Sequence, residues 1–286
     1  MQEYINRIFI GAMLLIVTFL MSYYSPFAIA IFVLALSCLS IFEFKSLVNK
    51  MGIYPRINWL YFFSVVFIVF PLLLNDIFKF HNIFVFQLTL LLAAYLIIFS
   101  TIFFNTNVTK FQDITASLWA IFHLALLPSY LVWIRLLDNG FQYFITLIIT
   151  VSVCDISGLF FGKLFGKHKL APHISPNKTV EGSSAALIAA SLAFFLLAKL
   201  FHFTIVNPFY FKYLSFISED LIFIIIGFLI SVLAQLGDLL VSVVKRAAGV
   251  KDTSRILLSH GGVLDRVDSH FFVTWLAFLC FAYLMA

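Results

Sequence analysis

The sequence of 286 residues has little charge, few prolines and almost no cysteine: 11% of residues are charged, and there are 7 Pro and 3 Cys. Soluble domains carry roughly a quarter charged residues, so this chain does not have enough polar surface to face water on all sides. Sparse charge also excludes a disordered chain. Cys38, Cys154 and Cys280 lie in apolar runs, far from any paired spacing, which excludes a disulfide-rich scaffold and a cysteine metal site. We expect these three to fill the core or face lipid.

Apolar residues are abundant instead: 63% of the chain is hydrophobic, 37 residues are Phe and the mean hydropathy is +1.08. A bilayer core of about 30 Å needs about 20 apolar residues per helix. The sequence therefore predicts an all-α, polytopic integral membrane protein with about nine transmembrane helices. These lie near 7–23, 25–42, 58–75, 83–104, 114–134, 141–162, 183–205, 221–245 and 269–285. Tyr23 to Pro26 is expected to be a tight turn between two spans.

Basic residues are distributed unevenly about these spans. Most of the 18 Lys and Arg lie at the amino end or in loops on the same side of the membrane as the amino end. The exceptions, at or near the opposite face, are Lys79, Arg135, Lys199 and Lys212. Since short cytoplasmic loops carry the excess of Lys and Arg, we expect the amino terminus in the cytoplasm and a location in the cell (inner) membrane. The same rule, with attraction to anionic lipids, is enough to explain the basic stretch around 43–57.

Polar residues that the helices do not use gather in two stretches, 155–182 and 235–269. Both belong to the carboxyl-terminal half, so we divide the chain into amino-terminal helices, 1–140 with about five spans, and a catalytic region, 141–286 with about four. The polar stretches are expected to be loops that form an active site on the cytoplasmic side.

The first polar stretch combines glycines with cations. Asp155 lies within or at the edge of a span, where a carboxylate needs a partner cation or water, although a helix-capping role is also possible. The run Gly162 to Lys169 suits close approach of the backbone to phosphate oxygens, with Lys supplying charge. The run Ser175 to Thr179 is expected to be a turn that carries hydroxyl and ammonium donors.

The second polar stretch places charged residues on single helix faces. Asp238, Ser242, Lys245 and Arg246 are three to four residues apart, and so are Asp265 and Asp268 at the next helix start. Two crowded carboxylates repel unless a cation lies near them. Asp oxygens beside phosphate-binding cations favour Mg²⁺. The alternatives are carboxylates stabilised by the helix dipole and an internal pair with Arg266, a structural role for His260, and a simple hinge at Gly261 and Gly262.

At these residues the sequence resembles the phosphatidate cytidylyltransferase (CDP-diacylglycerol synthase) family. The family's carboxyl-terminal signature is matched by Ser242, Lys245-Arg246, Lys251-Asp252, His260-Gly261-Gly262, Asp265-Arg266 and Asp268. A second shared stretch is matched by Gly162 to Leu170 and by Ser175 to Thr179. The amino-terminal half resembles the family in hydropathy alone.

The resemblance implies a reaction of CTP with phosphatidic acid in the bilayer, giving CDP-diacylglycerol and pyrophosphate with Mg²⁺. On that basis we expect metal ligands at Asp238, Asp265 and Asp268, which would hold Mg²⁺ and, if there is one, a second cation. The expected catalytic residues are Asp238, Lys245, Arg246, Lys251, Asp252, His260, Asp265, Arg266 and Asp268. The expected substrate-binding residues are Asp155, Lys167, Lys169, Ser175, Lys178, Thr179, Ser242, Gly261 and Gly262.

Two other functions remain open from the sequence. Another CTP-dependent lipid phosphotransferase, such as a polyprenol kinase, would share Mg²⁺ and a basic face. An ion-coupled transporter would share intramembrane Asp residues, although no internal repeat is visible here. No feature indicates a nucleic-acid partner, and the sequence leaves open whether the chain forms a homodimer.

Overall fold

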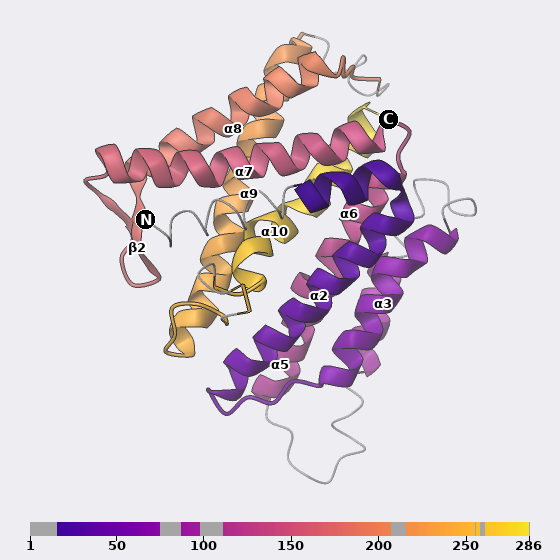
Figure 1. Cartoon of the computed structure of the whole chain (residues 1–286), viewed down its shortest axis with the longest axis vertical. Coiled ribbons are helices and arrows are strands. Elements are labelled where there is room, and N and C mark those ends of the chain that lie inside the picture. The colour runs from indigo at the N-terminus through magenta and orange to yellow at the C-terminus, as the bar shows by residue number, and fades with distance from the viewer. Residues whose placement is uncertain are drawn as a thin grey trace. The chain divides into compact units, whose positions relative to one another are not determined.

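The computed structural model describes residues 16–74, 87–97, 111–206, 216–254, 256–257 and 261–285, and these residues are mostly helical (Figure 1). The elements are α2 (Pro26–Asn49), α3 (Ile57–Leu74), α5 (Phe111–Ala120), the π-helix η1 (Ile121–Leu126), α6 (Leu127–Leu136), α7 (Gly140–Phe165), β1 (Lys169–Ala171), β2 (Ser175–Thr179), α8 (Val180–Leu200), α9 (Glu219–Ala247), α10 (Leu264–Cys280) and the π-helix η4 (Phe281–Met285).

The chain forms two compact units. The first comprises Met1–Leu136 and Val244–Val267, and the second comprises Leu137–Val243 and Asp268–Ala286. The division falls near the end of α9 and in the first turns of α10, so each of these helices contributes residues to both units.

In the first unit, α2, α3 and the continuous α5–η1–α6 helix pack together. The helix α2 begins after Ser25, whose Oγ accepts a hydrogen bond from the Ala28 amide at 3.1 Å, so the helical structure is interrupted at Ser25, within the expected turn. Halfway along the three helices, the Ser37 hydroxyl donates to Ser64 Oγ (3.2 Å) and to the Leu124 carbonyl in η1. A wide π turn leaves backbone carbonyls in need of other donors, and Ser37 supplies one.

In the second unit, α7 and α8 lie side by side (Figure 1). They approach so closely at Gly182 that a Cβ there would be 2.5 Å from the Gly158 carbonyl oxygen and 2.9 Å from Gly162 Cα. Tyr143 of α7 stacks on Phe281, with ring centroids 4.6 Å apart, and donates to the Met285 carbonyl at 3.1 Å. The glycines that were expected to mark a loop therefore belong to a tightly packed helix pair.

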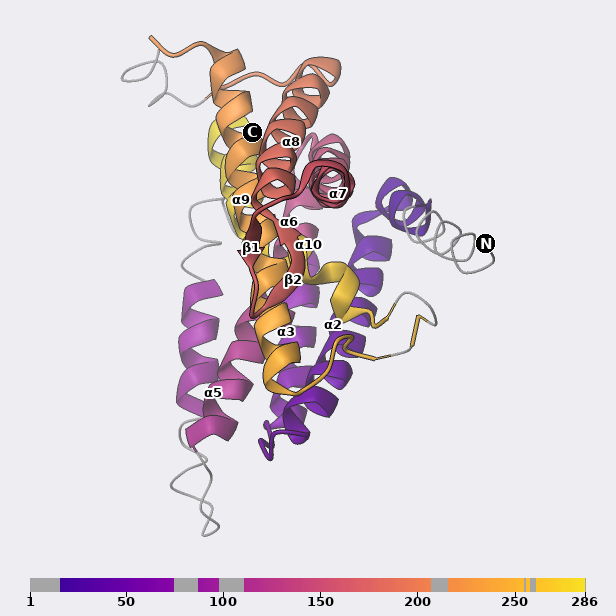
Figure 2. The same ribbon diagram turned by 90° about the vertical axis from the view of Figure 1, so that its left-hand side faces the viewer.

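The first polar stretch is not one loop, and this expectation was wrong. Residues up to Phe165 continue α7, and α8 begins at Val180. Between them β1 and β2 form an antiparallel hairpin (Figure 2), with Lys169 opposite Thr179 and Ala171 opposite Ser175. The run Ser175 to Thr179 is therefore a strand rather than a turn. The second polar stretch is helical at both ends, because α9 reaches Ala247 and α10 begins at Leu264.

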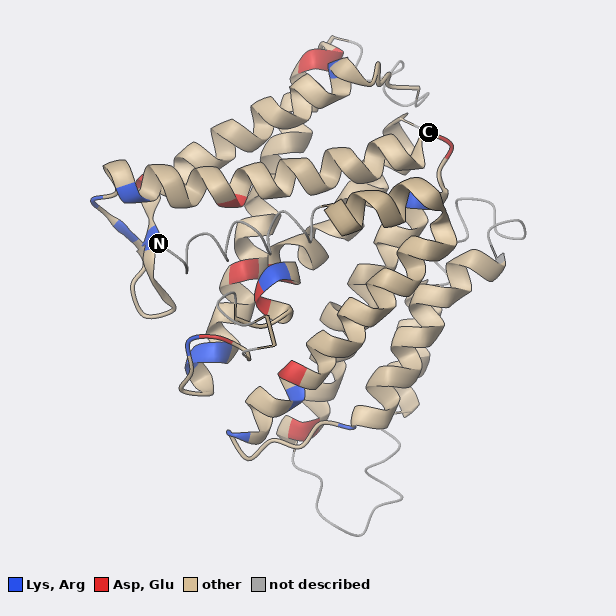
Figure 3. Cartoon of the chain, in the orientation of Figure 1, with Lys and Arg blue, Asp and Glu red and all other residues tan. Residues whose placement is uncertain are grey.

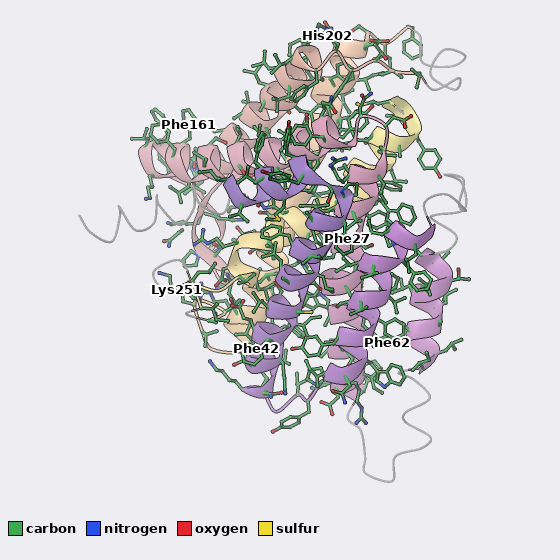
Figure 4. The ribbon with its side chains drawn as sticks, turned by 45° about the vertical axis from the view of Figure 1, so that its right-hand side comes forward. Phe27, Phe42, Phe62, Phe161, His202 and Lys251 are labelled. Carbon is green, nitrogen blue, oxygen red and sulfur yellow. The ribbon has the colours of Figure 1, made fainter. Side chains whose placement is uncertain are left out.

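The protein is an α-helical integral membrane protein by the length and composition of its helices. Within the described residues, six helices are long and apolar enough to cross a membrane, and Ile57–Leu73 and Gln87–Ile97 are shorter apolar helices. Most of the first expected span, near 7–23, lies outside the described residues, as does part of the span near 83–104. Figure 4 shows Phe27, Phe42 and Phe62 pointing away from their helices, and each is more than half exposed, as suits contact with lipid. The three cysteines are free, and Cys154 and Cys280 are buried as expected of core residues.

Candidate active site

The charged residues of the motifs form two clusters, one in each compact unit, and each is described by itself. In Figure 3, basic and acidic segments adjoin where α9 ends and α10 begins, and basic segments gather along the hairpin. We call the group Lys245, Thr253, Gly262 and Asp265 the Lys245 cluster. We call the group Lys178, Asp238 and Ser242 the Lys178 cluster.

The Lys245 cluster is built around an ion pair. Lys245 Nζ lies 2.8 Å from Asp265 Oδ1, and the two side chains are only 10% and 8% exposed. Lys245 is on the last turn of α9 and Asp265 is on the first turn of α10. A cation near the end of one helix and an anion near the start of the next are each favoured by the helix dipole.

The other oxygen of Asp265 organises the loop before α10. Oδ2 accepts hydrogen bonds from the Thr253 amide (2.8 Å), the Thr253 hydroxyl (2.9 Å) and the Gly262 amide (2.9 Å). Gly261 has φ +79°, which favours glycine, and a Cβ there would lie 2.9 Å from Asp265 Oδ2. The paired glycines thus let the backbone wrap around the Asp265 carboxylate.

Two residues in this region, Thr253 and Glu43, were missed by the sequence analysis. Glu43 of α2 is fully buried and accepts hydrogen bonds from the Val263 and Leu264 amides at the start of α10, at 2.9 and 2.8 Å. The stretch around 43–57 was attributed to topology and lipid attraction because of its Lys and Arg residues. The only available signal was a carboxylate in the middle of an apolar run, which requires buried partners.

The Lys178 cluster joins β2 to α9. Lys178 Nζ lies 2.6 Å from Asp238 Oδ2, with both side chains about a quarter to a third exposed (25% and 31%). The Ser242 hydroxyl, one turn further along α9, donates to Asp238 Oδ1 at 3.4 Å. The expected spacing of Asp238 and Ser242 on one face of a helix is confirmed, and the hairpin brings in a cation from 60 residues earlier in the chain.

The start of the hairpin is held by Glu181 in the first turn of α8. Its carboxylate accepts hydrogen bonds from the Lys167 and His168 amides at 3.1 and 3.2 Å and contacts His168 Nδ1 at 2.6 Å. Thr179 caps α8, because its Oγ1 accepts from the Gly182 amide at 3.2 Å. Lys167 and Lys169 are exposed, so their ammonium groups are available to a ligand in water.

Two further candidates lie in the second unit. The Ser269 hydroxyl donates to Asp155 Oδ2 at 3.0 Å, so this carboxylate has a neutral hydroxyl partner, whereas a cation or water was expected. Asp268 is buried, and its Oδ1 accepts from the Ser269 amide at 2.8 Å.

The remaining candidates are more exposed. Arg246, Lys251, Asp252 and Arg266 are exposed, and the Arg246 side chain donates to the Val250 carbonyl at 3.1 Å. Figure 4 labels Lys251 on the segment that follows α9. Ser175 is half-buried in β2, and His260 lies outside the described residues.

The three expected metal ligands are all carboxylates, which is the donor type that Mg²⁺ prefers. In this structure the nearest cationic partners of Asp238 and Asp265 are the ammonium groups of Lys178 and Lys245. Across the part of the chain that is described, no three His, Cys, Asp or Glu side chains converge closely enough to form a metal site.

Comparison with known proteins relates the chain to one family. A family model described as the cytidylyltransferase family matches residues 5–284. The phosphatidate cytidylyltransferase of Staphylococcus saprophyticus is 38% identical over 187 residues, 65% of this chain and 66% of that protein. The phosphatidate cytidylyltransferase of Staphylococcus aureus is 34% identical over 189 residues (66% and 67%), and that of Bacillus subtilis is 34% identical over 188 residues (65% and 65%). The similarity thus spans about two thirds of these relatives.

Proposed function

The chain belongs to the cytidylyltransferase family, and from that premise we propose that it is a phosphatidate cytidylyltransferase. It would convert CTP and phosphatidic acid into CDP-diacylglycerol and pyrophosphate, a step of phospholipid biosynthesis. The observation that carries this proposal is the family match over residues 5–284. That range includes the Lys245 and Lys178 clusters, which provide buried and half-buried cations next to carboxylates.

The nucleophile of this reaction is charged before it reaches the protein. The second pKa of a phosphomonoester is about 6, so the phosphate of phosphatidic acid is largely ionised at neutral pH. One of its oxygens attacks the α-phosphorus of CTP. A new P–O bond forms, the bond from the α-phosphorus to the oxygen that bridges to the β-phosphorus breaks, and pyrophosphate leaves. The protein must therefore supply orientation and positive charge rather than a general base.

The basic side chains are suited to that task in different ways. Lys245 is held by Asp265 in a largely buried position, where an ammonium group interacts with phosphate more strongly than it does in water. Lys178 is held by Asp238 at the hairpin. Arg246, Lys251 and Arg266 are exposed and can meet the departing pyrophosphate from the aqueous side.

We extend the proposal to Mg²⁺, for which Asp238, Asp265 and Asp268 are the candidate ligands. When bound, the ion would neutralise charge on the triphosphate. The support is the carboxylate donor type of all three residues. Asp238 and Asp265 now pair with Lys178 and Lys245, so the ion would take the place of those ammonium groups.

The membrane setting follows from the lipid substrate. Lifting acyl chains into water costs about 0.8 kcal/mol per CH₂ group, so CTP has to reach phosphatidic acid at the membrane surface. We propose nine spans, an amino terminus in the cytoplasm and an active site on that side of the inner membrane. A homodimer is the assembly to test, and the molar mass of the purified protein in detergent measures it.

The direct test uses purified protein in detergent micelles with phosphatidic acid, CTP and MgCl₂, with the CDP-lipid detected by mass spectrometry. We expect CDP-diacylglycerol and pyrophosphate in equal amounts, and no product when phosphatidic acid is left out. Excess EDTA should stop the reaction. Product formation at an unchanged rate in EDTA would reject the role of Mg²⁺ but not the cytidylyl transfer.

A further inference from the structure

Glu43 is a fully buried carboxylate near the carboxyl end of α2. Its neighbour Phe44 stacks on Trp119 of α5, with ring centroids 5.0 Å apart, which fixes this turn of α2 against the bundle. A carboxylate at such a position is destabilising by several kcal/mol unless donors surround it. The structure supplies those donors from the segment 253–264.

Both oxygens of Glu43 are satisfied by that segment. Oε1 accepts from the Ser254 hydroxyl (2.6 Å) and the Val263 amide (2.9 Å). Oε2 accepts from the Thr253 hydroxyl (3.1 Å) and the Leu264 amide (2.8 Å). The four donors come from residues more than 200 positions away in the sequence, and all of them belong to the same compact unit as Glu43.

The start of α10 has no cap of its own. The first amides of a helix lack partners within the helix, and a polar side chain just before the first turn usually accepts from them. Here the residue before Leu264 is Val263, which has no side-chain acceptor. The Glu43 carboxylate takes that role from another helix, and its negative charge lies at the positive end of the α10 dipole.

Thr253 connects Glu43 to the Lys245 cluster. Its hydroxyl lies 3.1 Å from Glu43 Oε2 and 2.9 Å from Asp265 Oδ2, so one hydroxyl faces two carboxylates. Gly262 lies directly against the Glu43 carboxylate and leaves no room for a side chain, because a Cβ there would lie 2.5 and 2.7 Å from the two Glu43 oxygens. Displacement of the Glu43 carboxylate would therefore move Thr253 and Gly262, which are two of the residues that hold Asp265.

We infer that Glu43 is a positioning residue: it fixes the start of α10 and the turn at Thr253 and Ser254, and through Thr253 it sets the position of Asp265 and of its partner Lys245. Glu43 acts through these residues and does not touch the substrate. The consequence for activity rests on the proposed cytidylyl transfer, whereas the consequence for the segment does not.

The first experiment is hydrogen–deuterium exchange of the full-length protein in detergent, comparing wild type with Glu43→Gln. The side-chain amide of Gln has an NH₂ group in place of one carboxylate oxygen. That group cannot accept a hydrogen bond, so the hydrogen bonds from the Val263 and Leu264 amides cannot both be kept. We expect exchange in peptides that cover 251–264 to become at least about tenfold faster, with α7 and α8 unchanged. Unchanged exchange in 251–264 would overturn the inference, whatever the enzyme's activity.

The matched control is Asp113→Asn. Asp113 is another buried carboxylate of the same unit, and its Oδ1 accepts from the Tyr54 amide at 2.7 Å, but it has no hydrogen bond to the described residues of the segment 251–264. We expect this variant to lower the melting temperature while leaving exchange in 251–264 and kcat per folded molecule unchanged. Equal effects of both variants on kcat would mean that Glu43 contributes to stability alone.

The second experiment measures kinetics per folded molecule. We expect Glu43→Gln to lower kcat about tenfold or more with little change in KM for phosphatidic acid. Thr253→Val should have a similar effect, Thr253→Ser should restore most of the activity, and the double variant Glu43→Gln/Thr253→Val should be no worse than the stronger single variant. Fully multiplicative effects would show that the two residues act independently and would overturn the proposed connection.

If Glu43→Gln does not fold, Ser254→Ala removes one hydrogen-bond donor to Glu43. We then expect the same changes in exchange and kcat, with a smaller magnitude.

The two failures can be distinguished. A wild-type protein that makes no CDP-lipid rejects the proposed function, while faster exchange in Glu43→Gln still supports the positioning role. A wild-type enzyme that is active, combined with unchanged exchange and unchanged kcat in Glu43→Gln, rejects the role of Glu43 alone.

Discussion

The ion pair of Lys245 and Asp265 places two charges where little water reaches them. Removing a charged group from water costs several kcal/mol, and the mutual attraction of the pair offsets this only when the remaining hydrogen bonds are also made. Here they are made, because Asp265 Oδ2 accepts from Thr253 and Gly262. The pair therefore contributes to the order of this segment, and under the proposed function Lys245 would also bind phosphate.

Lys245→Gln should leave the Asp265 charge buried without its cation. We expect the free energy of unfolding to fall by about 3–5 kcal/mol and kcat/KM to fall about 100-fold or more, measured by denaturant unfolding and by formation of CDP-lipid. Lys199→Gln is the control, since Lys199 pairs with Asp220 at a half-exposed position and should affect neither quantity. Normal turnover in Lys245→Gln would remove this lysine from the site.

Gly262→Ala tests the space beside Glu43. The new Cβ would meet both oxygens of Glu43 and the Thr253 hydroxyl, so we expect a loss of stability of about 1–3 kcal/mol together with a loss of activity. Gly158→Ala is a matched control, because its Cβ would lie 3.5 Å from Ala186 Cβ, an ordinary contact. A thermal shift assay on both variants makes the comparison, and equal melting temperatures would contradict the packing described for Gly262.

At the scale of elements, the hairpin β1–β2 carries several of the predicted substrate-binding residues, including Lys167, Lys169 and Lys178 near or within it. Its two ends are attached differently. Glu181 holds the backbone before β1, and the pair of Lys178 and Asp238 holds β2. The hairpin is therefore tethered at both ends, which positions its exposed cations.

Glu181→Gln should loosen the first tether without removing a predicted substrate contact. We expect faster amide exchange at 166–170 and a rise of several-fold in KM for CTP, with kcat within about twofold of wild type, because a contact made equally in the ground state and the transition state affects KM and not kcat. Asp220→Asn, an exposed carboxylate in the first turn of α9, should change neither. A lower kcat with an unchanged KM would argue against a substrate-binding role for the hairpin.

The helices could be predicted because their apolar runs satisfy a length criterion, and the cation-rich motifs could be located from their spacing. The hairpin could not, since Gly158 and Gly162 read as loop residues in the sequence but serve close packing of α7 against α8. Lys178 and Asp238 meet because the chain folds back between β2 and α9. Their spacing in the sequence does not predict this ion pair. Glu43 was missed because its partners lie more than 200 residues away.

At the scale of the whole molecule, the high apolar content indicates a membrane protein, and the few charged residues are the candidates for its proposed chemistry. Six described helices are long and apolar enough to cross a membrane, and several of their Phe side chains are exposed. The uneven distribution of Lys and Arg between the two expected faces gives the proposed orientation its support.

Orientation can be measured with single cysteines in a variant that lacks Cys38, Cys154 and Cys280. In intact cells, a membrane-impermeant maleimide should label Lys199→Cys and should not label Lys251→Cys, and in inside-out vesicles the pattern should reverse. Both positions are exposed enough to react in detergent, which provides the control. Labelling of Lys251→Cys in intact cells would place that segment outside the cytoplasm.

The central claim is transfer of a cytidylyl group to phosphatidic acid, and CTP labelled with ³²P at either the α- or the γ-phosphate tests it most directly. With the purified protein, phosphatidic acid and Mg²⁺, the account predicts that the α label enters the lipid and the γ label leaves as pyrophosphate. Entry of the γ label into the lipid would identify a lipid kinase instead. Absence of both labels from the lipid, with protein shown to be folded, would contradict the proposed function outright.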